Sequence, residues 1–332
     1  MSSENFNYPL APSTEQIRTT KSTTLFEPPI IKSGIPLKHQ RDRPLINLLL
    51  FLATLASTMY TGSLYYAGFQ SNFTADIPSV SLLKGSWYSL TILAILGTHE
   101  FGHYFACRYY NLNASLPYFL PAPFMTGTIG AVIRIREQIP TKKMLFDIGI
   151  AGPIAGFIIT VPTLFLGIWL SQVSPLPDSE GALLFSLGEP LLFQIAAGII
   201  WGSIPEGYSI NLHPMGFAAW LGLLVTSLNL FPIGQLDGGH ISYATLGSRS
   251  TAVTLASASI VVGLAFFSTS WIVWAILIVL MIAIGGPRHP PTLDNEVPLD
   301  QTRYLIAIGA VIIFVLCFTP IPIELTDFLD KH

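Results

Sequence analysis

The pattern His-Glu-x-x-His, formed by His99, Glu100 and His103, interrupts the apolar run 92–103 and constrains this chain more than any other feature. On a helix, His99 and His103 share one face, close enough for both imidazoles to reach a single Zn²⁺. Glu100 would lie beside that ion, where it could take a proton from water and pass one to a leaving amine. In a soluble helix this short pattern is often an ordinary polar face. At membrane depth an ionisable residue costs about 3 kcal/mol, so the apolar surroundings favour a metal site.

The composition is that of an integral membrane protein. Of the 332 residues, 51% are hydrophobic and only 11% are charged, and the mean hydropathy is +0.57. The net charge of -3 gives no basic excess for binding nucleic acid. Cys107 and Cys317 lie in or at the ends of apolar runs, so the sequence predicts neither a disulfide framework nor a cysteine-based zinc site.

The apolar runs predict an all-α polytopic membrane protein with about seven transmembrane helices. The shorter run 191–201 predicts a re-entrant or interfacial helix. With the N-terminus inside, all of the sixteen Lys and Arg residues except Lys84 and Lys331 fall on the cytoplasmic side, as membrane proteins prefer. The predicted spans are 45–68, 82–107, 144–170, 215–231, 251–267, 271–285 and 304–321.

The expected domains follow from these runs. Residues 1–43 are polar, rich in Ser, Thr and Pro, and contain a cluster of Lys and Arg, so they predict a disordered basic cytoplasmic tail. They contain no short apolar core of a signal peptide, and three glutamates interrupt what a transit peptide would keep free of acid. We expect a transmembrane domain at 44–322, with a catalytic core at 82–250, and a C-terminal tail at 323–332.

The segment 109–142 is neither a span nor an ordinary loop. Three prolines in 117–124 exclude a helix interior, and the run 127–139, which alternates apolar and charged residues toward its end, predicts a short strand or hairpin at the membrane surface. A strand edge there could pair with an unwound substrate segment. The alternative is a surface loop without catalytic consequence.

A candidate third ligand follows the span 215–231. Pro232 and three glycines break the helix, and broken backbone at membrane depth is tolerated only where it is buried in protein or lines a cavity. We therefore expect Asp237 in this segment to face protein or a cavity rather than lipid. Together with His99 and His103 it would give two histidines and one carboxylate, with a fourth position open, which is a catalytic zinc arrangement. Asn229 could donate a hydrogen bond to a developing oxyanion.

Three other polar residues are weaker candidates. Asp147 lies one turn inside its span and is either a polar contact behind the metal ligands or a residue at the membrane interface. His240 follows Asp237 by three residues, and we interpret it as structural or as a contact behind the ligands rather than a ligand. His213 precedes a proline at the opposite membrane face and is expected to be interfacial.

These residues carry a family resemblance. His99-Glu100-Phe101-Gly102-His103, together with Asn229-x-x-Pro232-x-x-x-x-Asp237-Gly238, resembles the site-2 protease family of intramembrane zinc metalloproteases. The residues around Asn229 and Asp237 look most similar to the branch of plastid and cyanobacterial members and their bacterial relatives. The resemblance implies one zinc ion bound by His99, His103 and Asp237, Glu100 as general base, and Asn229 orienting the substrate or the oxyanion.

The resemblance also implies a function. The family cleaves peptide bonds within or near a transmembrane segment of another protein, often in regulated intramembrane proteolysis, so the expected partners are a transmembrane protein substrate and the lipid bilayer. Only about forty residues join the third and fourth spans, too few for the PDZ domain that several relatives insert there.

Two other classes of protein remain possible from the sequence. A membrane metal transporter would use the same side chains without hydrolysis, but it would show polar residues at several depths rather than at one level. A catalytically inactive relative that binds membrane proteins is disfavoured by the intact Glu100. We expect a bacterial inner membrane, with the N-terminus and the active site toward the cytoplasm; the alternative is a thylakoid or plastid membrane.

Overall fold

The computed structural model describes residues 43–72, 79–122, 126–176, 184–294 and 297–326, all of which belong to one unit, Gln40–His332. Residues 1–42 of the expected tail and 327–332 lie outside the described residues. The helices are α1 Pro44–Ser71, α2 Ser86–Tyr109, α3 Lys142–Trp169, α4 Leu191–Trp201, α5 Pro214–Leu230, α6 Asp237–Leu246, α7 Ser250–Leu264, α8 Ser270–Gly285 and α9 Gln301–Cys317, with short 3₁₀ turns η1 Leu82–Gly85 and η2 Gly247–Arg249.

The described chain is therefore mainly helical, and each predicted span contains a helix that begins or ends within a few residues of its expected limits. Local chemistry explains several of these limits. Pro44 and Pro214 occupy the first turns of α1 and α5, where a missing N–H costs nothing. The Thr141 side chain accepts a hydrogen bond from the Met144 amide at 3.2 Å and so caps α3.

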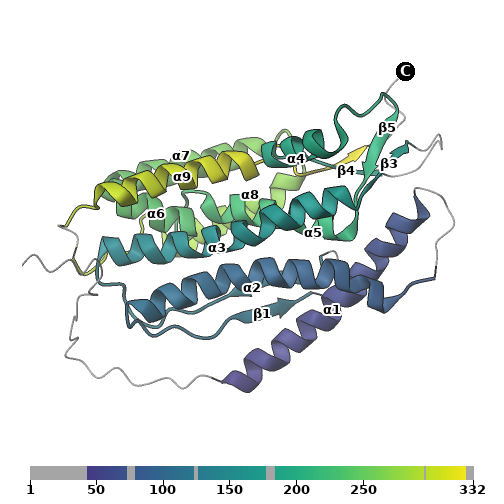
Figure 1. Cartoon of the computed structure of the whole chain (residues 1–332). Coiled ribbons are helices and arrows are strands. Elements are labelled where there is room, and N and C mark those ends of the chain that lie inside the picture. The colour runs from purple at the N-terminus through teal and green to yellow at the C-terminus, as the bar shows by residue number, and fades with distance from the viewer. Residues whose placement is uncertain (1–42, 73–78, 123–125, 177–183, 295–296, 327–332) are drawn as a thin grey trace, which may run out of the picture. The chain divides into compact units, whose positions relative to one another are not determined.

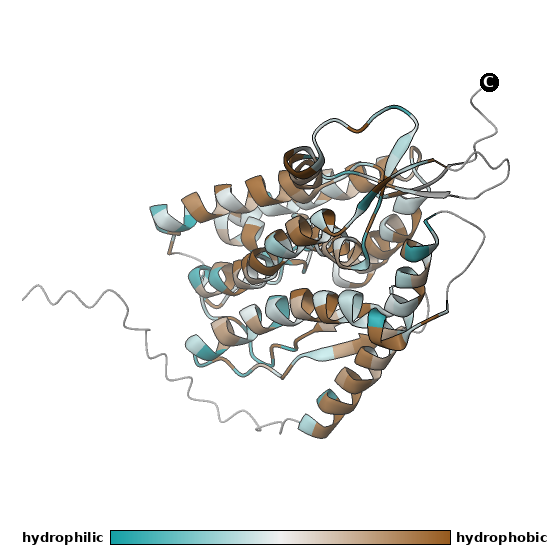
Figure 2. Cartoon of the chain, turned by 45° about the vertical axis from the view of Figure 1, so that its right-hand side comes forward, coloured by the Kyte–Doolittle hydropathy of each residue, from teal (hydrophilic) through white to brown (hydrophobic). Residues whose placement is uncertain are grey.

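Among the described helices, α1 and α3 are both long enough and apolar enough to cross a membrane. α4, α5, α8 and α9 are shorter apolar helices, and α2 owes its lower hydropathy in part to the site residues that it carries. Figure 2 shows hydrophobic residues along most of the helices and hydrophilic ones near several helix ends. On α8, large apolar side chains face outward, as a lipid-facing helix requires: Ile272, Val273, Ile276, Leu277, Val279, Leu280 and Ile284.

The strands differ from the sequence prediction. The hairpin pairs β1, Tyr118–Pro121, with β2, Thr128–Val132, so its first strand lies in the proline-rich run that the sequence did not place in a strand. Pro121 is tolerated because it ends β1 at an irregularity in the register. The charged end of the alternating run is not in a strand, although Ile135 forms an isolated bridge with Ala114.

The structure contains two further antiparallel sheets. The sequence predicted an all-α architecture with one short β segment and did not predict these sheets. β3, Gln172–Pro175, pairs with β5, Tyr208–Asn211, and β4, Leu184–Leu187, pairs with β6, Ile323–Thr326, which occupies the start of the expected C-terminal tail. Each of these strands has four residues, too few to show a clear two-residue period in the sequence.

α3 is the central helix of the arrangement that positions the site. It packs against α2 on one side and α5 on the other, and the three helices run side by side, while α1 crosses obliquely along α2 (Figure 1). The contact between α3 and α5 is close at Gly167, where a Cβ atom would lie 2.3 Å from the Gly216 Cα. The sheet β3–β5 lies at the end where α3 stops and α5 begins (Figure 1).

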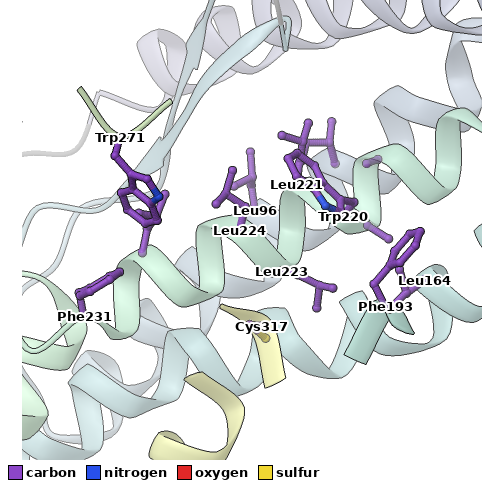
Figure 3. Packing of buried hydrophobic residues seen from close by; sticks show 14 of the residues in the cluster. Leu96, Leu164, Phe193, Trp220, Leu221, Leu223, Leu224, Phe231, Trp271 and Cys317 are labelled. Carbon is purple, nitrogen blue, oxygen red and sulfur yellow. The ribbon is translucent and has the colours of Figure 1, made fainter. Parts of the chain in front are cut away.

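The main hydrophobic core surrounds α5 (Figure 3). The side chains of Trp220 and Leu223 are fully buried, as is Leu164 on α3. The indole Nε1 of Trp220 donates to the Gly188 carbonyl at 2.7 Å, so this large buried side chain keeps its polar atom satisfied. This packing fixes α5 and, through it, the segment that follows toward Asp237.

Candidate metal centre

α2 presents the first two candidate ligands. His99 and His103 lie one turn apart on α2, both are buried, and their Nε2 atoms are 3.1 Å from each other. The ring of His103 is oriented by α3, because its Nδ1 lies 2.7 Å from the Ile148 carbonyl oxygen. A carbonyl only accepts, so Nδ1 carries a proton, and in the neutral form of this ring the Nε2 lone pair is the one available to a metal.

Asp237 reaches the same point from the other part of the chain. α5 ends at Leu230, the chain turns through Gly234 with φ of +53°, and α6 begins at Asp237. Its Oδ2 lies 3.3 Å from each of the two histidine Nε2 atoms. The break that the sequence predicted after α5 thus allows α6 to return a carboxylate to α2.

The three donor atoms fit a zinc ion. A tetrahedral zinc with bonds of about 2.0 to 2.2 Å separates its ligand atoms by about 3.3 to 3.6 Å. The separations of 3.1 and 3.3 Å among His99, His103 and Asp237 agree with this to within a few tenths of an ångström. Among the described residues these three form a group able to hold a metal ion. A tetrahedral zinc held by three protein ligands would keep its fourth position for a reacting molecule.

Glycines of α3 form the wall behind the histidines. A Cβ atom at Gly152 would lie 2.1 Å from the Nε2 of His103, and one at Gly156 would lie 3.2 Å from the Cβ of His99. α2 in turn approaches through Gly102, where a Cβ would lie 2.5 Å from the Ala151 carbonyl oxygen. Small residues on a membrane helix allow another helix to approach closely, and here the imidazoles of the metal site occupy the space that they leave.

Glu100 is buried next to the three donors but is not one of them. The backbone of Ile133, just after β2, lies close to the Glu100 carboxylate, and β2 packs on α2. The hairpin that the sequence placed at the membrane surface is therefore in contact with the site. Asn229, near the end of α5, has its Nδ2 3.2 Å from the Nε2 of His99, so its amide donor lies beside the candidate ligands.

The weaker candidates lie elsewhere. Asp147 pairs with Arg303 of α9, at 2.5 Å between Oδ2 and Nη2, and also accepts from the Tyr110 hydroxyl, so its partners are not the metal-site residues. His240 has its Nδ1 2.6 Å from the Nε2 of His289. His213 is buried at the start of α5, where its Nδ1 accepts from the Met215 amide, and it packs against aromatic rings.

Two histidines and a carboxylate around an open position, with a glutamate beside them, are the arrangement of zinc metallopeptidases. The chain belongs to peptidase family M50, whose model matches residues 87–270. This is the site-2 protease family, so the family predicted from the two motifs is confirmed.

Curated relatives support the same family. The chain is 30% identical over 277 residues to "Probable zinc metalloprotease EGY2, chloroplastic" of Oryza sativa subsp. indica. The aligned region covers 78% of this chain and 48% of the relative. It is 31% identical over 257 residues to the EGY2 protein of Arabidopsis thaliana, covering 76% and 45%. Against the Arabidopsis EGY1 protein the identity is 28% over 243 residues, covering 71% and 43%. The chain thus spans about half the length of these relatives. No solved structure matches.

Proposed function

We propose that this protein is an intramembrane zinc metalloprotease that hydrolyses peptide bonds within or near the transmembrane segments of other membrane proteins. One observation carries the proposal: the Nε2 atoms of His99 and His103 and the Oδ2 of Asp237 lie 3.1 to 3.3 Å from one another, buried among apolar helices, with Glu100 alongside. The curated relatives bear zinc metalloprotease names, which agree with this site.

The roles of the residues follow from their chemistry. His99, His103 and Asp237 would hold the zinc, which supplies Lewis-acid activation of the scissile carbonyl and of water. Glu100 takes the proton from the attacking water and returns it to the leaving amine. The Nδ2 group of Asn229 donates a hydrogen bond to the oxyanion that develops on the carbonyl.

A transmembrane substrate has to unwind before it can react, because the backbone groups of a helix are paired internally. The contact between Ile133 and Glu100 supports a role for the hairpin in receiving the unwound segment, with its backbone pairing along a strand edge. Helix-breaking residues near the scissile bond should therefore accelerate cleavage. A set of model substrates with and without a Gly-Pro insertion at the cleavage site would measure this.

The proposed topology has about seven spans, with residues 44–322 as the transmembrane domain and the N-terminus and active site on the cytoplasmic side. The helices with 15 to 17 residues, α5, α7, α8 and α9, would cross with help from the extended residues at their ends. The distribution of Lys and Arg supports the orientation. For the membrane we propose the bacterial inner membrane, and reporter fusions after residues 110, 290 and 320 would test the orientation.

The activity is tested with the purified full chain reconstituted together with a membrane-protein extract. Mass spectrometry of newly formed N-termini compares the wild type with Glu100→Gln and His99→Ala. We expect cleavages inside apolar segments that disappear in both variants, while Glu100→Gln keeps about one zinc per chain and His99→Ala loses it. Zinc binding without cleavage in any form would favour an inactive binding protein, and zinc flux into sealed vesicles would favour a transporter.

A further inference from the structure

Two histidines outside the set of candidate ligands form a pair next to the metal centre. His240 lies on α6, and His289 lies in the link between α8 and α9, beyond the residues matched by the family model. The Nδ1 of His240 is 2.6 Å from the Nε2 of His289, and the rings meet edge to face. His289 also stacks on Tyr243, with ring centroids 4.6 Å apart, so its ring is held on two sides.

The direction of the hydrogen bond in this pair is fixed by a third group. The Nδ1 of His289 lies 2.6 Å from the Pro290 carbonyl oxygen, which can only accept, so this Nδ1 carries a proton. In the neutral ring of His289 the Nε2 is then unprotonated and accepts from His240. His240 therefore carries its proton on Nδ1 and has an unprotonated Nε2.

The neutral state of His289 agrees with its surroundings. Burial lowers the pKa of His289, and the bond to the Pro290 carbonyl opposes this only in part. No ion pair with a carboxylate stabilises its charged form within the described part of the chain. An imidazolium at this position would reverse the polarity of the bond to His240, and burial disfavours it.

His240 is close to the part of α6 that supplies the third ligand. It follows Asp237 by three positions, so the two side chains lie on the same side of the helix. Both residues pack on α3 at Gly149, where a Cβ atom would lie 2.9 Å from the Cβ of His240 and 3.4 Å from the Asp237 carbonyl oxygen. A change in the conformation of His240 would thus be felt beside the metal centre.

We propose that His289 is a positioning residue for the peptidase site: it holds His240 in the tautomer that offers an unprotonated Nε2 to a main-chain N–H of the bound peptide. The inference rests on the proposed function. An unwound peptide brings backbone N–H donors into a site with little water, and each of them needs an acceptor. His240 would supply one such acceptor on the α6 side of the zinc.

Two variants of His289 separate this role from simple packing. In His289→Gln the side-chain oxygen can still accept from the Nδ1–H of His240, whereas in His289→Phe a ring can still stack on Tyr243 but nothing accepts. We expect kcat to fall about tenfold in His289→Phe, a size typical of lost partners behind metal ligands, and to recover in His289→Gln. The zinc content should be the same in both.

The tautomer is measured independently of activity, by solid-state NMR of the zinc-free full chain labelled with ¹⁵N-histidine. The signals that disappear in His240→Gln identify those of His240. We expect a protonated Nδ1 on His240 in the wild type and in His289→Gln, and a mixture of tautomers in His289→Phe. An unprotonated Nδ1 in the wild type, zinc bound between the two rings, or equal losses of kcat in both variants would overturn the inference. A wild type with no peptidase activity would refute the proposed function, while the spectra would still decide whether His289 fixes the tautomer.

Discussion

Gly152 and His103 are in such close contact that a Cβ atom on the glycine would lie 2.1 Å from the Nε2 of the histidine, the ring atom nearest to Asp237. The position of the imidazole therefore depends on the absence of a side chain on α3. Together with the bond from the His103 Nδ1 to the Ile148 carbonyl, this contact makes α3 the support of the metal centre, although α3 contributes no candidate ligand.

Gly152→Ala should displace His103 and weaken zinc binding by about 10- to 100-fold, the range found for changes behind metal ligands. Its effect on the free energy of unfolding should be about 1 to 3 kcal/mol, because the added methyl group is overpacked. Zinc titration monitored by mass spectrometry measures the affinity. Gly309→Ala in α9 is the matched control, since a Cβ there meets nothing within 4 Å, and it should bind zinc normally.

Removal of zinc should destabilise the folded protein, because the three donors join α2 to α6. At a free zinc concentration one hundred times the Kd, the bound ion contributes about 2.7 kcal/mol. Tryptophan fluorescence during heating, with and without a chelator, should show a lower unfolding temperature for the chelated wild type. In Asp237→Ala the chelator should change little; an equal change in both proteins would contradict a zinc ion bound by Asp237.

The pair between Asp147 and Arg303 should stabilise the fold without affecting zinc. Arg303 contacts both carboxylate oxygens of Asp147, at 2.8 and 2.5 Å, and joins α9 to α3. Arg303→Gln should lower the free energy of unfolding by about 2 kcal/mol, less than for a fully buried pair because both side chains are partly exposed.

A double-mutant cycle with Asp147→Asn isolates this pair, and the double variant should lose less stability than the two single variants together. Zinc content should be normal in all three proteins. Loss of zinc in Asp147→Asn would instead support the alternative that Asp147 acts as a polar contact behind the metal ligands.

His213 should make the protein sensitive to acid. Its neutral Nδ1 caps α5, and burial, with a smaller effect of the Lys84 charge, lowers its pKa from 6.5 to about 4. Because the folded-state pKa lies below the unfolded one, this contribution to stability is complete above pH 6.5 and decreases as the pH falls from 6.5 toward 4. The unfolding temperature of the wild type should therefore drop between pH 7 and pH 5. His213→Asn, which can also cap the helix, should show a smaller drop.

The helices and the grouping of the candidate ligands were predictable because both follow from short-range rules. Apolar runs of known length locate the helices, and the four-residue spacing of His99 and His103 places them on one face. Asp237 could be added because a carboxylate in a broken apolar helix needs a buried partner. The metal-binding roles of His99, His103 and Asp237 and the catalytic roles of Glu100 and Asn229 remain predictions.

The rest depends on contacts that the sequence does not encode locally. Nothing near Asp147 in the sequence indicates Arg303, and nothing near His240 indicates His289, because each partner comes from another helix or link. The sheets β3–β5 and β4–β6 pair segments far apart in the chain, and each strand is too short to be recognised alone. Gly152 could be recognised as a close-contact residue, but only the structure identifies His103 as the group in contact with it.

The separation of the candidate ligands along the chain has a consequence for biosynthesis. α2 supplies two donors early, whereas Asp237 is added more than a hundred residues later, after the supporting helix α3 and the core helix α5. At about 5 to 20 residues per second, a nascent chain spends roughly ten seconds or more with its histidines in the membrane and no complete zinc site. A protein with this arrangement would have no peptidase activity toward its neighbours at the translocation machinery until α6 had joined α2.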